Sequence, residues 1–304
     1  MTQSSTHTSP VIVVHGGAGL SGPERHEAVK AGCQVAARAG YNMLAAGGSA
    51  LDAVVAAVVS LEDDPTFNAG RGSALTREGI VEMDAAVMRG QDEAAGAVGL
   101  VRTCQHPILL ARALLDSEHV MMAGPVADDL GINLGLAQQP QSYFVTERQT
   151  RSLAEHLDKL NANQPVQQGT GTVGAVALDR HGHLTAATST GGRTGQRTGR
   201  VGDTPLVGAG TFADATGAAS GTGTGEQFMR AVAAYRAVAG LATTTPQLAT
   251  KHALDKVQAL GGRGGMILVT HTGEVVIAHN TPNIAYAWMR EDAHDAGVVA
   301  EKLV

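Results

Sequence analysis

The sequence predicts a mixed α/β fold in which two sheets are sandwiched between layers of helices. Of the 304 residues, 43% are hydrophobic, but only 3% are aromatic and 39 are glycine. Small side chains must therefore fill much of the core, which suits layers of sheet and helix that approach closely. The order of the elements is the second observation, because predicted strands lie at both ends of the chain with helices between them. We expect residues 1–304 to form a single domain.

The first half of the chain is predicted to combine short strands with longer helices. Residues 11–14 are an apolar, mainly β-branched run that stops at a glycine-rich turn, which predicts a buried strand. The apolar pattern predicts a hairpin within 79–88 and another strand at 97–101. Apolar residues at helical spacing predict helices at 23–43, 49–61, 107–115, 125–136 and 146–160. Ser49 is placed to cap the second of these helices.

The second half begins after a segment that has little to bury. Residues 161–171 are mostly polar, and their burial could not offset the entropy lost on ordering them, so they are predicted to form a flexible linker. Two β-rich runs at 172–178 and 184–190 flank a short turn and predict a hairpin. Further strands are predicted at 205–212, near 218, and at 265–271, 274–279 and 284–289, with helices at 226–241 and 246–260.

Composition also narrows the function classes. The net charge is −6 and no cluster of Lys and Arg is present, which argues against a nucleic-acid partner. Residues 1–10 lack the features of a secretory signal, and no apolar run reaches about 18 residues, so we expect a cytoplasmic protein with no membrane partner. Cys33 and Cys104 are far apart and are predicted to be buried, reduced thiols rather than metal ligands.

Thr172 stands where the predicted linker meets a predicted buried strand. On its own it would be an ordinary β-branched strand residue. The preceding residue is Gly171, and glycine can adopt a backbone geometry in which the next hydroxyl attacks the glycine carbonyl. An N-to-O acyl shift followed by hydrolysis would then cut the chain between Gly171 and Thr172. The new N-terminus would carry a nucleophilic hydroxyl and an α-amine with a pKa of about 7.7–8.0, which could act as its base.

Seven short motifs follow one another along the chain: HGGAG at 15–19, FNAGRGS at 67–73, EMDA at 82–85, GTVGAVA at 171–177, TSTGG at 188–192, GRVGDTP at 199–205 and GTGTGE at 221–226. Each is a weak signal, but all seven in this order closely resemble the plant-type asparaginase and isoaspartyl peptidase family of N-terminal nucleophile hydrolases. The resemblance spans nearly the whole chain and implies a four-layer αββα sandwich. It also implies self-cleavage into an α subunit, residues 1–171, and a β subunit, residues 172–304.

The resemblance assigns roles to the residues that match the family's catalytic positions. It implies that Thr172 is the nucleophile, and that Thr190 is a second hydroxyl that tunes the α-amine and helps maturation. Thr222 and Gly223 match the family's oxyanion hole, and glycine-rich backbone before a helix supplies N–H groups that suit an oxyanion. The alternative for 221–225 is a phosphate-binding loop, but the lysine and the spacing of a P-loop are missing.

Arg200 and Asp203 match the family's clamp for the α-carboxylate and the α-amine of an aspartyl group. An arginine fork fits a carboxylate and an aspartate complements an ammonium, whereas the alternative is a surface salt bridge. Gly225 and Asn68 complete the expected substrate-binding residues, and Asn68 is expected to face the site and support maturation or water placement. Many relatives have Asn-Lys where this chain has Gly-Gln at 195–196, which predicts a looser loop beside the substrate.

No cofactor is expected for catalysis. The segment 61–71 matches a loop that wraps a structural sodium ion in this family, and the resemblance implies that backbone carbonyls are the ligands. By position, these carbonyls belong to Leu61, Glu62, Asp64, Phe67, Ala69 and Arg71. Hard cations take oxygen ligands, but backbone ligands leave no side-chain pattern, so the ion is implied by the resemblance alone.

Together these features predict an amidohydrolase that releases L-aspartate from isoaspartyl (β-aspartyl) peptides and from L-asparagine. Both are small substrates with an amide on the aspartyl side chain. One alternative is a glycosylasparaginase-like amidase, although that branch carries Asp where this chain has Gly171. Another is a catalytically silent binding protein of the same fold. The resemblance further implies a dimer of α–β units.

Overall fold

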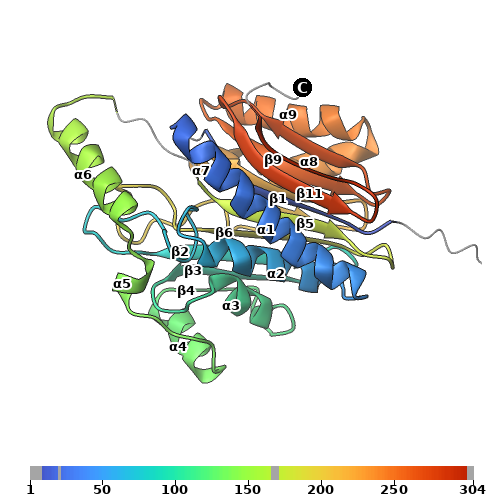
Figure 1. Ribbon diagram of the computed structural model, residues 1–304, viewed down its shortest axis with the longest axis horizontal. Helices are drawn as coiled ribbons and strands as arrows, with labels where there is room; N and C mark the ends of the chain where they lie inside the picture. The colour runs from blue at the N-terminus through green and yellow to red at the C-terminus, as the bar shows by residue number, and fades with distance from the viewer. Residues whose placement is uncertain (1–8, 20–21, 166–170, 300–304) are drawn as a thin grey trace, which may run out of the picture.

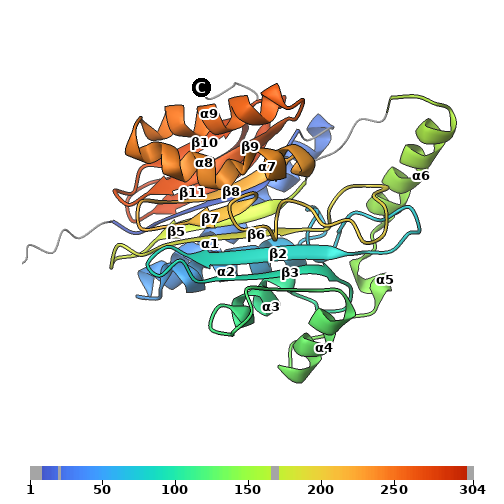
Figure 2. The ribbon, with the colours of Figure 1, turned by 180° about the vertical axis from the view of Figure 1, so that it is seen from behind.

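A computed structural model describes residues 9–19, 22–165 and 171–299, and within these ranges the chain forms two β-sheets with helices packed against them (Figures 1 and 2). The predicted mixed α/β class is therefore confirmed. The larger sheet has the order β12-β11-β1-β5-β6-β2-β3-β4, and its described pairs are antiparallel except β3 with β4. Its strands are β1 (Val11–Ala18), β2 (Met83–Arg89), β3 (Ala95–Val101), β4 (Met121–Ala123), β5 (Val173–Leu178), β6 (Leu184–Thr190), β11 (Ile284–Arg290) and β12 (His294–Val299).

The smaller sheet faces the larger one. It has the order β10-β9-β8-β7 and is antiparallel. Its strands are β7 (Thr211–Ala213), β8 (Gly217–Gly223), β9 (Gly264–Thr270) and β10 (Val275–His279). Strands β1 and β5 contact β8 and β9 across the space between the sheets, and β6 contacts β7 and β8. The β5–β6 hairpin, which begins just after Thr172, is therefore covered by the smaller sheet on one face.

Helices cover the remaining faces of the two sheets. Helices α1 (His26–Ala45), α2 (Ala50–Asp63) and α3 (Pro107–Leu114) pack on the larger sheet, and α8 (Ala233–Ala239) and α9 (Pro246–Ala259) pack on the smaller one. The others are α4 (Pro125–Asn133), α5 (Gln141–Phe144), α6 (Glu147–Asn161) and α7 (Gly225–Ala231), with short 3-10 turns η1 (Pro23–Arg25) and η2 (Gly240–Ala242). Helix α6 stands beside the sheets rather than on either of them (Figures 1 and 2).

Strand β1 explains why residues 11–14 form a continuous apolar run. Successive side chains of a strand point to opposite faces of the sheet. Ile12 and Val14 enter the core that the larger sheet forms with α1–α3, whereas Val11 and Val13 enter the core that contains residues of both sheets. A strand that is covered on both faces must be apolar at nearly every position.

Two predicted elements differ from the structure for a shared reason. The strand predicted at 205–212 is mostly a turn, and only β7 at its end is a strand. The helix predicted at 226–241 is interrupted at Val232, whose φ of 48° and ψ of 55° are left-handed. At the start of α8, the N–H groups of Ala234 and Tyr235 donate to the carbonyls of Ala209 and Gly208 in that turn, at 3.0 and 2.9 Å. Hydrogen bonds to the turn thus replace those that would continue α7.

The remaining local predictions have mixed outcomes. Ser49 caps α2 as predicted, in a reciprocal arrangement with Asp52, and Cys33 and Cys104 are free and buried. Strands β4 and β12 and helix α5 were not predicted. The predicted linker at 161–171 falls partly outside the described residues, because 166–170 are among those left out. In the ranges that the structure covers, no helix combines the length and apolar character needed to cross a membrane.

The close packing of α1 on α2 gives a test of the small-residue core. A Cβ added at Gly40 in α1 would lie 2.7 Å from the carbonyl oxygen of Ala53 and 2.2 Å from Cδ1 of Ile12. Gly40→Ala should therefore reduce the free energy of unfolding by about 1–3 kcal/mol, although alanine is the better helix former. In α4, a Cβ added at Gly131 has the end of the Gln138 side chain as its nearest neighbour, at 3.2 Å, so Gly131→Ala is the matched control. Thermal unfolding of both variants decides the point, and a Gly40→Ala protein as stable as the wild type would contradict it.

Candidate active site

The hydroxyls of Thr172 and Thr190 meet at the open end of the β5–β6 hairpin. Val173 lies opposite Ser189 in this pair of strands, so the register places Thr172 opposite Thr190. The Thr172 Oγ1 donates to the Thr190 Oγ1 at 3.0 Å, and both residues are buried. The Thr190 Oγ1 also accepts the N–H of Gly192 at 3.0 Å. Two hydroxyls that the sequence placed in one catalytic group are thus in direct contact.

Asn68 lies against the residue that precedes Thr172. A Cβ added at Gly171 would be 2.8 Å from the Cβ of Asn68, so a larger residue at 171 would displace one of them. The Asn68 Nδ2 donates to the carbonyl of Gly192 at 2.8 Å, and its Oδ1 accepts the N–H of Ala74 at 2.6 Å. Asn68 therefore ties the Gly171–Thr172 bond to the turn that follows Thr190.

Thr222 presents an unpaired hydroxyl from the smaller sheet. It is fully buried on β8, and its Oγ1 has no hydrogen-bond partner among the described residues. Side chains two positions apart point the same way along a strand, so Thr222 points in the direction of Ser220. The Ser220 hydroxyl lies only 2.0 Å from where a Cβ on Gly174 would be, near the start of β5. Gly223 is the last residue of β8 and Gly225 is the first residue of α7, so both lie where the strand leads into the helix.

Arg200, Asp203 and Gly225 converge on one point. A Cβ added at Gly225 would lie 2.6 Å from the Asp203 Oδ1 and 2.8 Å from the Arg200 Nη2, so the glycine makes room for both. The Arg200 Nε donates to Glu226 at 3.2 Å, and its Nη1 donates to Gln196 at 3.3 Å. The second oxygen of Asp203, Oδ2, is buried without a hydrogen-bond partner in the described chain. An unpaired carboxylate oxygen beside a guanidinium fits a ligand that carries both an ammonium and a carboxylate.

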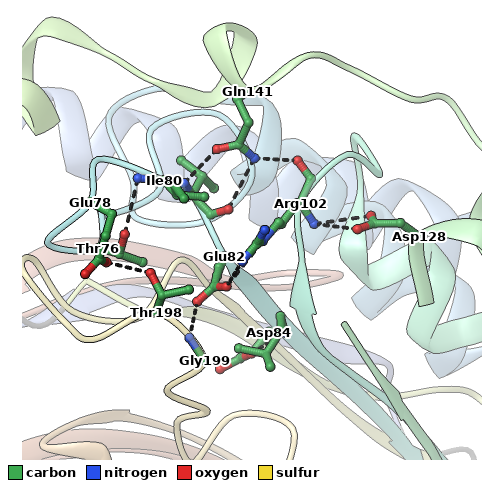
Figure 3. A network of polar contacts seen from close by, with 12 residues as sticks. Thr76, Glu78, Ile80, Glu82, Asp84, Arg102, Asp128, Gln141, Thr198 and Gly199 are labelled. Atoms are coloured by element: carbon green, nitrogen blue, oxygen red, sulfur yellow. Dashed lines mark hydrogen bonds and ion pairs between the residues drawn. The ribbon is translucent and has the colours of Figure 1, made fainter. Parts of the chain in front are cut away.

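Two acidic residues, Glu82 just before β2 and Asp84 within it, anchor the loop that carries Arg200 (Figure 3). The Glu82 Oε2 accepts the N–H of Gly199 at 2.7 Å, and Oε1 accepts from Arg102 at 2.6 Å. The Asp84 Oδ2 accepts the N–H of Gly202 at 3.0 Å. The chain around Arg200, whose segment 195–200 was predicted to be loose, is therefore tied to Glu82 and Asp84 on both sides of Arg200.

Asp84 also connects the two groups of site residues. It faces Thr190 across the β2–β6 pair while its side chain holds Gly202. The sequence contained this pair of carboxylates within a motif, but we assigned no role to it. The available signal was two acidic residues two positions apart at the start of an otherwise apolar strand, since such charges are buried only with partners.

A buried polar chain lies beneath the strand that begins at Thr172. The His15 Nε2 and the Ser220 Oγ are 2.9 Å apart, and Ser220 continues to the Thr188 hydroxyl at 2.8 Å. Burial lowers the pKa of His15 to about 3, so its imidazole is neutral. A Cβ added at Gly174 would lie 2.6 Å from the His15 Nε2, which explains the glycine opposite His15.

The segment predicted to bind sodium, 61–71, begins in the last turn of α2 and contains Asn68. Three of the six named carbonyls already accept hydrogen bonds from the protein. The Glu62 carbonyl accepts from the Arg71 N–H at 2.7 Å, and the Asp64 carbonyl accepts from the Phe67 N–H at 3.1 Å. The Phe67 carbonyl accepts from the Arg148 guanidinium at 3.0 Å. In the part of the chain that is described, His, Cys, Asp and Glu side chains form no cluster that could hold a metal ion.

Asp203 should make the free energy of unfolding depend on pH. Burial raises its pKa to about 7, although Arg200 opposes the shift. The unfolded chain releases this proton near pH 4 and the folded protein keeps it until near pH 7, so the free energy of unfolding falls across this interval. Asp203→Asn should therefore have a higher Tm than the wild type at about pH 8, and this advantage should disappear near pH 4. Thermal unfolding across this range is the measurement, and an advantage independent of pH would contradict the assignment.

Several known proteins have similar sequences over nearly the whole chain. The family described as asparaginase matches residues 8–299. The rat isoaspartyl peptidase/L-asparaginase is 42% identical over 303 residues, which cover 97% of this chain and 91% of the rat protein. The isoaspartyl peptidase of Escherichia coli is 41% identical over 96% of this chain and 97% of its own length, and that of Salmonella typhimurium is 42% identical over 91% and 94%. The chain therefore belongs to the asparaginase family.

Proposed function

We propose that this protein is a self-processing amidohydrolase that releases L-aspartate from isoaspartyl peptides and from L-asparagine. The observation that carries the proposal is the 3.0 Å contact between the hydroxyls of Thr172 and Thr190, directly after Gly171. The names of the similar rat and E. coli proteins, isoaspartyl peptidase/L-asparaginase and isoaspartyl peptidase, support the substrate class. We further propose the four-layer αββα sandwich, which is supported by the facing sheets and the helices packed on each of them.

In the proposed self-cleavage, the Thr172 Oγ1 attacks the carbonyl carbon of Gly171. The peptide nitrogen leaves as the acyl group moves to oxygen, and water then hydrolyses the ester. The products are an α subunit, residues 1–171, and a β subunit that begins with a free Thr172. Asn68 supports this step because it packs against Gly171 and holds the turn at Gly192.

In the proposed hydrolysis, Thr172 attacks the side-chain amide carbon of the substrate. Its α-amine takes the hydroxyl proton and passes it to the leaving amine, which is ammonia for asparagine and a peptide amine for an isoaspartyl peptide. The Thr222 hydroxyl and the Gly223 N–H stabilise the oxyanion of the tetrahedral intermediate. Water then releases aspartate from the acyl-enzyme and restores Thr172.

The substrate is held by its α-carboxylate and its α-amine. Arg200 binds the carboxylate, and Asp203 binds the ammonium through the oxygen that has no partner among the described residues. A bound ammonium favours the ionised form of Asp203, which reverses the effect of burial on its pKa. Gly225 leaves space for both groups, and the Glu226 carboxylate keeps Arg200 in place before the substrate arrives.

The contact at Gly171 favours this proposal over a glycosylasparaginase-like amidase. That branch carries Asp before the nucleophile, whereas the 2.8 Å approach of Asn68 leaves no room for a side chain at 171. A catalytically silent binding protein of the same fold is the other alternative, and it would remain one uncut chain.

The cut at Gly171–Thr172 is the first test of the proposal. Wild-type protein should give two fragments on a denaturing gel, and N-terminal sequencing of the smaller one should begin Thr-Val-Gly-Ala. Thr172→Ala should remain a single chain and lose hydrolysis, whereas Thr190→Ala should be less severely affected. An uncut wild-type chain that is fully active would rule out the mechanism, because an amide nitrogen cannot act as the base.

Arg200→Lys tests the substrate clamp separately from the nucleophile. Lysine keeps the charge but loses the two-pronged contact with a carboxylate, so kcat/KM should fall roughly tenfold or more for both substrates. Self-cleavage involves no free α-carboxylate and should be nearly unchanged. Steady-state kinetics and the extent of cleavage are measured on the same preparation. Unchanged kinetics would show that Arg200 does not bind the substrate carboxylate. Blocked cleavage would show that Arg200 stabilises the loop instead.

A further inference from the structure

The loop that contains Asn68 is built around the guanidinium of Arg148. This arginine lies near the start of α6, and its Nη2 is 3.0 Å from the carbonyl oxygens of Pro65 and Phe67 and 3.2 Å from that of Gly72. Three backbone carbonyls thus converge on one positively charged nitrogen. Carbonyl oxygens arranged in this way surround a cation, and here the cation belongs to a side chain.

Neighbouring groups hold the same loop through further hydrogen bonds to its backbone. The Gln149 Nε2 donates to the Gly72 carbonyl at 2.6 Å, and the Gly72 N–H donates to the Phe144 carbonyl at 2.8 Å. On the other side, the Arg25 Nη2 donates to the Thr66 carbonyl at 2.9 Å. Burial, with Arg25 nearby, lowers the pKa of Arg148 to about 10, so its guanidinium stays charged at neutral pH.

A sodium ion in this loop would have to share the Phe67 carbonyl with Arg148. Phe67 is one of the six residues whose carbonyls are the expected ligands, and its oxygen already accepts from the guanidinium. The carbonyls of Glu62 and Asp64 also have donors within the backbone. Two positive charges at one carbonyl repel each other, most strongly where water is excluded. The donors around this loop therefore fit a cationic side chain better than a free sodium ion.

We propose that Arg148 takes the place of a bound cation in this loop and acts as a positioning residue for Thr172. The link is short, because Phe67 immediately precedes Asn68, which contacts Gly171 and holds the turn at Gly192. The positioning role rests on the proposed function, whereas the replacement of the cation does not. The replacement of the cation predicts that the loop is stable without sodium and that it positions Thr172 without sodium.

The chain offers matched variants for this proposal. Arg148→Met removes the charge and its donors, Arg148→Lys keeps a charge with fewer fixed donors, and Arg151→Met is the control. Arg151 lies on the same helix but is exposed and pairs with Glu147 at 3.1 Å. Arg25, Arg148 and Arg151 line a polar cavity of ≈ 470 Å³, so a small cation in solution can reach the position of the missing guanidinium.

The first readout is thermal unfolding in the Thr172→Ala background, which needs no catalysis. Wild-type Arg148 should give the same Tm in sodium and choline salts at equal ionic strength. Arg148→Met should lower Tm by roughly 5 °C, with a smaller loss for Arg148→Lys and none for Arg151→Met. Added guanidinium at low concentration should restore part of the loss for Arg148→Met. A saturable rise of Tm with sodium when Arg148 is present, or no loss on Arg148→Met, would overturn the proposal.

The second readout is the rate of self-cleavage with Thr172 intact. Arg148→Met should slow it roughly tenfold or more because Asn68 and Gly171 lose their alignment, and guanidinium should accelerate the variant but not the wild type. Cleavage by Arg148→Met at the wild-type rate would overturn the positioning role. If wild-type protein never cleaves, the proposed function fails, while the Tm comparison still decides whether Arg148 replaces the cation.

Discussion

The pairing of β5 with β6 is the constraint on which the rest of the site depends. It places the first residue after Gly171 directly opposite the last residue of β6, so that two buried hydroxyls lie 3.0 Å apart. In the proposed mechanism the base is the α-amine of Thr172, so the mechanism needs a cut at the Gly171–Thr172 bond. A shift of the register by one residue would turn Thr172 to the other face of the sheet.

Two features determine the surroundings of the two hydroxyls. Glycines let neighbouring segments approach closely, and two carboxylates are buried nearby. Gly171, Gly174 and Gly225 each lie where a Cβ would meet a site residue at 2.8 Å or less. Asp84 and Asp203 are carboxylates whose pKa values are raised by burial, to about 6 and about 7. Burying them costs stability that the hydrogen bonds of Asp84 partly offset. For Asp203, one oxygen has no partner among the described residues, and in the proposed function the substrate ammonium offsets that cost.

The sequence predicts those features that depend on neighbours along the chain. The apolar run at 11–14, the cap at Ser49 and the threonine after Gly171 all follow from local composition, and the order of seven motifs implies the remaining site residues. Contacts between distant segments carry no such local signal. Glu82 binds Gly199 across 117 residues, Asp84 binds Gly202 across 118, and Arg148 binds Phe67 across 81. The interruption of the helix at Val232 has the same origin, because a turn some twenty residues earlier supplies the competing carbonyls.

The central claim is that Thr172, freed by cleavage, attacks the substrate with its own hydroxyl. It is tested most directly by acid-quenching the enzyme during turnover of L-asparagine and measuring the intact masses of the two fragments. The account predicts an aspartyl adduct on the fragment that begins at Thr172, located at that residue by peptide sequencing and absent in Thr172→Ala. An adduct on residues 1–171, or an aspartyl ester at another side chain of the smaller fragment, would contradict it.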